Sequence, residues 1–404
     1  MEKYIIKSKE IYTEDGIVSG GLLVEDGKIK AIFQGDVEAA DCPIIDYGEN
    51  RLVNGFIETH NHGYLGWSAG GTEEDVRGYL KATAAAGVTG VLPTVGEGTM
   101  TSAANLMDKE YEGTRMLGIH CFGPFLNEAK LAGGVREYNT EVTRDMAAAL
   151  YEESQGKMAL MTLAPEIKGM KSVLDYLKEK GVKIAMGHTS ATDEEAIWGI
   201  ENGVESVCHI CNMTSPIHHR NIGATGVGLM DDDIYVELIC DLYHVGKRML
   251  ELIFRIKPKD RIMMITDNNP LSGMQPGVYQ GGYDPNGTTT IGEDGLIRAS
   301  TGRISGSSMC ILDCIRHLVE ELGMPLEVVL PMTGLTAATY LGLDDKKGSI
   351  KVGKDADLVV LSDDYKSLAT YVEGTLCYTP DMRPGLINPD GRQPMDAWNK
   401  RIKK

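Results

Sequence analysis

The sequence predicts an α/β protein: a (β/α)8 TIM-like barrel joined to a small β-sandwich domain that is built from both chain ends. From about residue 52 to about residue 343, eight apolar strand-like runs alternate with helical patterns, which is typical of such a barrel. The two ends carry short alternating strands instead, and neither end can bury a core alone. We therefore expect the barrel in residues 51–345, and the sandwich with its tail in residues 1–50 and 346–404.

The expected barrel strands are short runs of mostly apolar residues. They cover 52–58, 88–95, 116–122, 158–163, 182–187, 204–210, 234–240 and 261–266. Helical patterns between them include 73–86 and 171–180, and the second pattern ends at Gly181, a natural C-cap. Thr192 and Glu195 form a capping box for the helix that follows. A doubly wound sheet is the alternative, but no G-x-G-x-x-G motif opens its first helix.

Composition and charge narrow the classes of protein. The chain of 404 residues is 42% hydrophobic and 24% charged, the profile of a compact soluble enzyme. Its formal net charge of -18 repels phosphate backbones, so we expect no nucleic-acid partner. Eight scattered cysteines without a signal peptide indicate reduced thiols in a cytoplasmic protein. No stretch approaches the ~20 apolar residues of a membrane span, so we expect no membrane association.

Side chains that can bind a metal follow the expected strands. His60 and His62 form an H-x-H pair at the end of the first run, and alternate residues of a strand face the same way. A lone pair of this kind at a turn is also compatible with two surface histidines. However, His188, His209, His244 and Asp267 follow later strands, so five of the nine histidines lie at strand ends. Barrel enzymes carry their active sites at these ends, and we therefore predict a metal-dependent active site.

This set of residues resembles the amidohydrolase superfamily, and most closely the N-acetylglucosamine-6-phosphate deacetylase family. The resemblance covers nearly the whole chain. The segments that carry it are 87–94 (GVTGVLPT), 123–127 (GPFLN), 162–166 (TLAPE), 187–191 (GHTSA), 304–307 (ISGS) and 353–358 (GKDADL).

The resemblance implies a hydrolase that removes the acetyl group from an N-acetylated amino-sugar phosphate. Its metal residues would be His60, His62, His188, His209 and Asp267. The cofactor is a divalent metal, with zinc as first choice and iron, manganese or nickel as alternatives. Metal-bound hydroxide would attack the acetamide carbon, while Asp267 takes up a proton as general base and returns it to the leaving amine as general acid.

The resemblance also implies how the sugar phosphate is held. Arg220 and His244 would bind the phosphate, helped by Asn212 and the backbone amide of Met213. In the family this arginine comes from the neighbouring subunit, which implies a homodimer. His218 and His219 either add charge beside Arg220 or belong to a solvated loop. His120 and His317 are given no functional role.

Two residues depart from the pattern of the family. Where the family has a metal-binding glutamate on strand 3, this chain has Phe122, and where the family has a carbonyl-polarising histidine, it has Gly134. Because phenylalanine cannot ligate a metal, the usual metal site cannot be complete. The substrate can therefore differ from N-acetylglucosamine 6-phosphate in its acyl group or its sugar.

Three interpretations of this departure stay open. In the one that we favour, His60, His62, His188 and Asp267 hold one metal, as in some deaminases of the superfamily, and His209 orients substrate or water. In the second, Cys121 is a thiolate ligand, although adjacent strand residues point to opposite faces. In the third, the chain is a weakly active homologue, an interpretation that the intact histidine set opposes.

Two other functions compete with deacetylation. Another amidohydrolase reaction, such as deamination or N-acyl amino-acid hydrolysis, is the main alternative, but residues 188–191 lack the glutamate that common deaminases carry there. A binding or scaffold role is the third possibility. Reused barrels usually lose their metal ligands first, whereas this chain keeps them.

Overall fold

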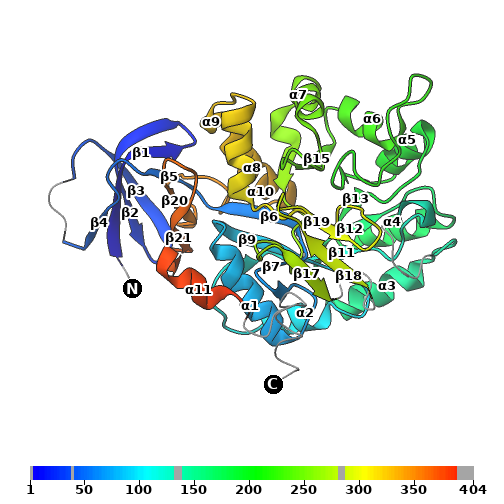
Figure 1. The fold of residues 1–404 in the computed structure, drawn as a ribbon, viewed down its shortest axis with the longest axis horizontal. Helices are drawn as coiled ribbons and strands as arrows, with labels where there is room; N and C mark the ends of the chain where they lie inside the picture. The colour runs from blue at the N-terminus through cyan, green and yellow to red at the C-terminus, as the bar shows by residue number, and fades with distance from the viewer. Residues whose placement is uncertain (1–2, 38–40, 132–138, 281–286, 389–404) are drawn as a thin grey trace.

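The computed structural model describes residues 3–37, 41–131, 139–280 and 287–388. Its centre is a parallel barrel, as the alternating sequence pattern predicts (Figure 1). The eight barrel strands are β6 (Phe56–Asn61), β9 (Val88–Val95), β11 (Ile119–Phe122), β12 (Met158–Leu163), β13 (Lys183–Met186), β14 (Ser206–Val207), β15 (Tyr235–Ile239) and β16 (Ile262–Ile265). A parallel bridge between Asn61 and Asn268 brings the end of the last strand back to the first. The two-residue strand β10 (Arg115–Met116) pairs with β9 outside this ring.

One helix follows each barrel strand before the next strand begins. In chain order these are α1 (Glu73–Ala84), α2 (Thr101–Met107), α3 (Arg144–Glu153), α4 (Met170–Glu179), α5 (Asp193–Glu201), α6 (Gly223–Met230), α7 (Lys247–Ile256) and α8 (Ile311–Arg316). The capping box predicted at Thr192 and Glu195 is present at the start of α5. Gly181 follows α4 with a φ of 72°, the left-handed conformation that a glycine after a helix adopts.

Helix α10 (Leu335–Leu341) closes the barrel at the N-terminal ends of its strands. Tyr340 lies inside the barrel, and its hydroxyl group lies 2.9 Å from that of Ser206 at the start of β14. Its ring also packs against Tyr235, the first residue of β15. The cluster of buried apolar residues that contains Tyr340 reaches Phe122 and Leu126. Because α10 covers the N-terminal ends of the strands, the C-terminal ends are the ones that can form an active site. Short helices complete the fold at α9 (Leu326–Thr333), α11 (Arg383–Leu386), 128–130, 259–261, 317–321 and 380–382.

Strands from both chain ends form one eight-stranded sheet beside the barrel (Figure 1). They are β1 (Lys3–Thr13), β2 (Gly16–Glu25), β3 (Lys28–Gln34), β4 (Ile44–Asp46), β5 (Arg51–Asn54), β20 (Leu358–Leu361), β21 (Ser367–Val372) and β22 (Thr375–Tyr378). Their buried side chains, among them Ile6, Leu22 and Val360, form a cluster separate from that of the barrel. The pairing of the two chain ends agrees with the expected second domain, whose boundaries stay a prediction.

The single strand expected over residues 52–58 is in fact two strands. β5 pairs with β1 and β20 in the end sheet, whereas β6 enters the barrel. The chain passes between the two sheets at Gly55, where a Cβ atom would lie 2.2 Å from the Thr89 hydroxyl oxygen. A continuous apolar run cannot reveal such a division, because both strands are buried.

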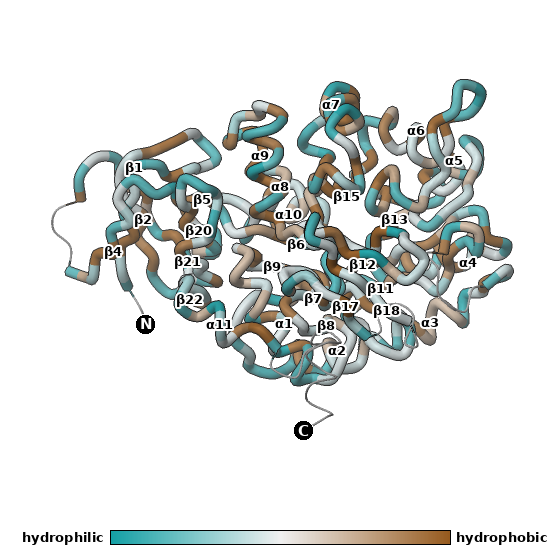
Figure 2. The backbone as a smooth tube through the Cα atoms, viewed as in Figure 1, coloured by the Kyte–Doolittle hydropathy of each residue, from teal (hydrophilic) through white to brown (hydrophobic). Residues whose placement is uncertain are grey.

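Two small sheets lie outside the ring. β7 (Gly63–Tyr64) pairs with β8 (Trp67–Ser68) directly after the H-x-H pair. A three-stranded sheet of β17 (Gly277–Gln280), β18 (Thr288–Ile291) and β19 (Ile297–Ala299) stands between β16 and α8. Central strands such as β12 consist largely of hydrophobic residues, whereas the loops beside α5 and α6 are hydrophilic (Figure 2). Among the described residues, no helix is both long and apolar enough to cross a membrane.

Candidate active site

The backbone is strained where the barrel strands end. His188, His209, Met213 and Asp267 are not glycines, yet their φ angles are 45°, 27°, 52° and 53°. Left-handed backbone costs free energy in residues other than glycine and is concentrated at functional sites. Four of the predicted site residues therefore occupy positions that the surrounding structure must hold in place.

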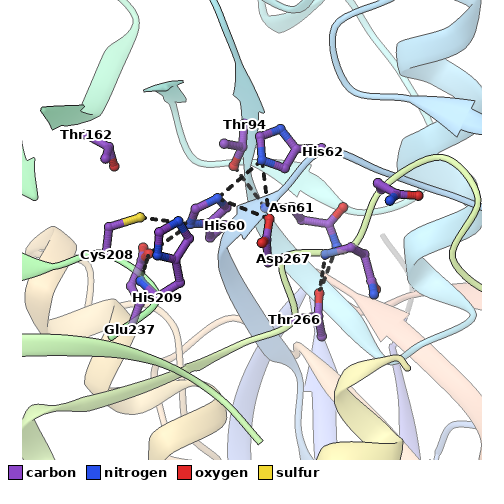
Figure 3. Close-up of polar contacts among 12 residues, drawn as sticks. His60, Asn61, His62, Thr94, Thr162, Cys208, His209, Glu237, Thr266 and Asp267 are labelled. Atoms are coloured by element: carbon purple, nitrogen blue, oxygen red, sulfur yellow. Dashed lines mark hydrogen bonds and ion pairs between the residues drawn. The ribbon is translucent and has the colours of Figure 1, made fainter. Parts of the chain in front are cut away.

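Three potential metal-binding atoms converge at the end of strand β6. His60 Nε2 lies 3.3 Å from His62 Nε2, and each of these atoms lies 3.4 Å from Asp267 Oδ1 (Figure 3). Two atoms that each lie about 2.0–2.1 Å from one tetrahedral zinc ion are about 3.4 Å apart. The three side chains thus have the spacing that a shared metal ion requires. Burial would raise the pKa of Asp267, but His60 and His62 lower it well below its usual range, so the carboxylate is ionised.

A buried carboxylate fixes the orientation of His60. His60 Nδ1 lies 2.9 Å from Glu237 Oε2, and the Thr59 hydroxyl donates a hydrogen bond to Glu237 Oε1 at 3.0 Å. Burial would raise the pKa of Glu237, but the neighbouring His60 lowers it to about 2. The ionised carboxylate therefore holds the proton of His60 on Nδ1 and leaves Nε2 free for a metal, an arrangement common in metal sites.

Glu237→Gln should weaken metal binding by about 10–100-fold, because the neutral amide no longer polarises His60. The measurement is the dissociation constant of zinc, obtained by competition with a chromophoric chelator. Glu205→Gln is the matched control, since this half-exposed glutamate pairs with Lys183 away from the site. Equal zinc affinities for Glu237→Gln and Glu205→Gln would contradict the orienting role.

The Phe122 ring packs against four histidines of the site. The centre of its ring lies 5.2 Å from that of His60, 5.4 Å from His62, 5.0 Å from His188 and 6.1 Å from His209. This position is at the end of β11, where the resembled family has its metal-binding glutamate. An apolar ring thus stands where the resembled family has a metal-binding carboxylate.

His188 and His209 do not join the three converging atoms. In the described part of the chain, two sets of possible ligand atoms lie within 4.8 Å of one another, and neither includes His188 or His209: they are His60, His62 and Asp267, and His60, Cys208 and Glu237. The rings of His188 and His209 are 5.0 Å apart, and the His209 ring lies 5.3 Å from that of His60. Burial, followed by repulsion from His60, lowers the pKa of His209 to about 4, so His209 is a neutral imidazole at neutral pH.

Three of the recognised sequence segments meet in one hydrogen-bond network. Glu166 accepts hydrogen bonds from the Thr189 hydroxyl at 2.5 Å, the Ser190 amide at 2.7 Å and the Asn127 side chain at 2.9 Å. The Asn127 amide in turn donates to the carbonyl of His188 at 2.9 Å. His188 Nδ1 lies 2.7 Å from the carbonyl oxygen of Lys130. The network therefore fixes both the backbone and the ring of His188.

His244 is held by an aspartate that the sequence analysis did not select. Asp241 Oδ2 lies 2.7 Å from His244 Nδ1 and accepts a hydrogen bond from the Ser307 hydroxyl at 2.8 Å. Burial would lower the pKa of His244, but its hydrogen bond to Asp241 raises it. This favours the positively charged imidazolium form, which suits a residue that contacts an anion.

A cavity of about 400 Å3 brings most of the predicted residues together. Its lining includes His62, His188, His209, Asn212, Met213, His244 and Asp267. Arg220 is not among the described residues that line it, because its side chain is exposed and lies 2.8 Å from His219. Arg303 does line this cavity, although the sequence analysis did not select it. Arg303 directly precedes the recognised 304–307 segment, and this position could have identified it as a candidate site residue.

The remaining histidines differ in burial and in hydrogen bonding. Both nitrogens of His120 have hydrogen-bond partners, the Thr59 carbonyl and the Thr162 hydroxyl, which agrees with a structural role. His317 is also buried, whereas His218 and His219 are exposed.

All eight cysteines lie in the described part and none forms a disulfide. Cys121 is fully buried and burial raises the pKa of its thiol, which disfavours a thiolate ligand. Gly134 lies outside the described residues.

Comparison with known proteins establishes the class of this enzyme. The sequence profile of the amidohydrolase family matches residues 51–378, so the chain belongs to this family. A second profile, the allantoinase composite domain, matches residues 1–50.

Individual relatives match nearly the whole chain and have more specific names than the family. N-acetylglucosamine-6-phosphate deacetylase of Bacillus subtilis is 28% identical over 395 residues, which cover 93% of this chain and 98% of that protein. N-acetylgalactosamine-6-phosphate deacetylase of Escherichia coli O157:H7 is 27% identical over 387 residues, covering 92% of this chain and 99% of that protein. The crystal structure of the Pasteurella multocida N-acetylglucosamine-6-phosphate deacetylase superposes with a TM-score of 0.83 at 29% identity, covering 93% of this chain and 99% of that one.

Proposed function

We propose that this chain is a metal-dependent deacetylase that hydrolyses the acetamide of an N-acetylated amino-sugar phosphate. The observation that carries the proposal is the convergence of His60 Nε2, His62 Nε2 and Asp267 Oδ1 at 3.3–3.4 Å. Relatives that match nearly the whole chain are named deacetylases of N-acetylglucosamine or N-acetylgalactosamine 6-phosphate, which supports this substrate class.

His60, His62 and Asp267 would hold the divalent metal, and zinc is the first choice for a set of two imidazoles and one carboxylate. When bound, the metal supplies Lewis acidity, which acidifies water and polarises the acyl carbonyl group. Three protein ligands are the usual number in a catalytic zinc site, because one position must stay open for water or substrate. His188 and His209 are then available to contact the substrate.

Asp267 is the residue that moves the proton. Its ionised carboxylate faces the cavity and has the low pKa of a group that is unprotonated at rest. It takes a proton from the attacking water and passes it to the amide nitrogen as the carbon–nitrogen bond breaks. This second transfer is needed because an amine is a poor leaving group until it is protonated. Neutral His209 lines the same cavity and would donate or accept a hydrogen bond during these steps.

The phosphate end of the substrate would lie near His244 and Arg303. Both residues line the cavity, and His244 favours its charged form. Arg220, exposed on its loop, would serve the cavity of a second copy of the chain, and we therefore propose a homodimer. Arginine suits this role because its planar guanidinium group grips phosphate with two hydrogen bonds.

Arg303→Ala should raise KM for N-acetylglucosamine 6-phosphate by about 10–100-fold, the cost of losing a hydrogen bond to a charged group. The KM for unphosphorylated N-acetylglucosamine should stay the same, because that substrate has no charge to lose. Steady-state kinetics of both substrates measure this difference, and Arg220→Ala should show the same selectivity. Arg298→Ala is the control, since Arg298 pairs with Asp294 instead. An equal effect on both substrates would remove Arg303 from phosphate binding.

Release of acetate from N-acetylglucosamine 6-phosphate by the zinc-loaded protein tests the proposed function. We expect turnover that stops when the metal is chelated and returns when zinc is added back. Absence of acetate release from protein that retains its metal would contradict deacetylation of this substrate class. It would redirect the search to deamination or N-acyl amino-acid hydrolysis.

A further inference from the structure

A second cavity adjoins the one that contains the metal-binding residues. Its volume is about 660 Å3, against about 400 Å3 for the first, and both volumes are in the range of small-molecule sites, about 300–1,000 Å3. The two cavities share four lining residues: His62, Phe122, Leu131 and Ser305. Because His62 Nε2 belongs to the converging set, a group that reacts there lies at the junction of the two cavities.

The linings of the two cavities differ in charge. The first contains Arg303 and His244, which attract an anion. Among the described residues that line the second, Glu97 is the only carboxylate, and no lysine or arginine is present. A phosphate group would be repelled there, so the sugar phosphate belongs in the first cavity. The substituent on the other side of the scissile bond must then extend toward the second.

The second cavity is largely apolar on the side that faces the site. Apolar lining residues include Val95, Phe122, Leu126, Leu131 and Leu271. Phe122 and Leu126 are nearly completely buried and belong to the apolar cluster inside the barrel, so they present a fixed surface. The Phe122 ring thus forms part of an apolar wall of the second cavity, against which a hydrocarbon chain can pack. An acetyl group, with one methyl carbon, would use little of a cavity of 660 Å3.

We propose that this second cavity, the acyl cavity, binds the N-acyl group, and that the enzyme hydrolyses N-acyl amino-sugar phosphates with acyl chains longer than acetyl. The inference rests on the proposed function and specifies its substrate class. The reaction is unchanged: the oxygen of water joins the acyl carbon and the carbon–nitrogen bond breaks. The amine keeps a proton from that water, and the product is a longer carboxylate in place of acetate.

The test is a series of substrates that differ only in the acyl chain: N-acetyl, N-propionyl, N-butyryl and N-hexanoyl glucosamine 6-phosphate. For the zinc-loaded protein, kcat/KM should rise with chain length by up to about 4-fold for each methylene group that is buried. A steep fall in kcat/KM as soon as the chain exceeds acetyl would overturn the acyl cavity while leaving deacetylation in place. No hydrolysis of any member of the series would overturn both the inference and the proposed function.

A variant that fills the acyl cavity gives a second, independent readout. Gly96 lines this cavity. The nearest atom to a Cβ added there is the Phe122 carbonyl oxygen at 3.8 Å, so the first atom of a side chain fits without a clash. Gly96→Leu should lower the ratio of butyryl to acetyl kcat/KM by about 10-fold or more, because it overfills the space for the longer chain. Gly385→Leu makes the same change in α11, where no atom lies within 4 Å of an added Cβ, and should not alter the ratio. A ratio unchanged in Gly96→Leu would contradict the acyl cavity.

Discussion

Replacing Asp267 by asparagine should reduce kcat for N-acetylglucosamine 6-phosphate by about 100–10,000-fold, the range observed for loss of a general acid–base group. The asparagine amide keeps the size of the side chain but cannot take a proton from water or return one to the amine. The carboxylate lies 3.4 Å from both His60 Nε2 and His62 Nε2, so the same change also weakens metal binding. Rates must therefore be measured at saturating zinc, with the metal content of each sample determined in parallel.

Asp260→Asn is the matched control for this experiment. Asp260 lies just before β16, the strand that Asp267 follows, but it is exposed and pairs with Arg261. Its replacement should leave kcat unchanged. An Asp267→Asn protein that binds zinc and retains kcat within about tenfold of the wild type would show that another residue moves the proton.

The second large effect distinguishes the two histidines that converge with Asp267, His60 and His62, from His188, which lies outside that set. His62→Asn should weaken zinc binding by more than about 100-fold, because losing a ligand costs more than losing a residue that only orients one. His188→Asn should keep its zinc and lose activity instead, since His188 lies outside the set of converging atoms. Metal content after extensive dialysis, measured by mass spectrometry, separates the two variants.

The comparison also decides between two ligand assignments. If His188→Asn loses its zinc as completely as His62→Asn does, then His188 is a metal ligand, and the set of His60, His62, His188 and Asp267 expected from the sequence is the right one. If only His62→Asn loses zinc, the site has three protein ligands. Thermal unfolding of both metal-free variants should be compared with that of the metal-free wild type, so that misfolding is not counted as loss of a ligand.

The sequence was sufficient to predict the barrel because each strand and each following helix has its own local pattern. The stretch from Lys171 to Lys180 places apolar residues on one face and ends before Gly181, and the structure has α4 there. The division at Gly55 was missed because it depends on a close approach to Thr89, which lies on another strand. Such contacts between distant segments leave no periodic signal in the chain.

The sequence predicted that histidines gather at the ends of the barrel strands, but the carboxylates that orient two of them, Glu237 and Asp241, were not selected. Glu237 is a lone acidic residue within the apolar run from Ile234 to Cys240, and a carboxylate inside a buried strand needs a partner. That signal could have identified it. Asp241, three residues before His244, could have been found in the same way.

Other features of the site could not be derived from the sequence. The spacing of His60, His62 and Asp267 depends on the bridge that joins β16 to β6 at Asn61 and Asn268. The two cavities and their shared wall depend on which side chains of different strands come together. The family resemblance implied that Phe122 replaces a metal ligand, but only the structure shows that its ring packs against four of the site histidines.

The most direct test of this account is the position of the metal in a crystal of the zinc-loaded protein, located by anomalous scattering at the zinc edge. The account predicts one strong peak bounded by His60, His62 and Asp267. A peak between His188 and His209, or none beside the H-x-H pair, would contradict it.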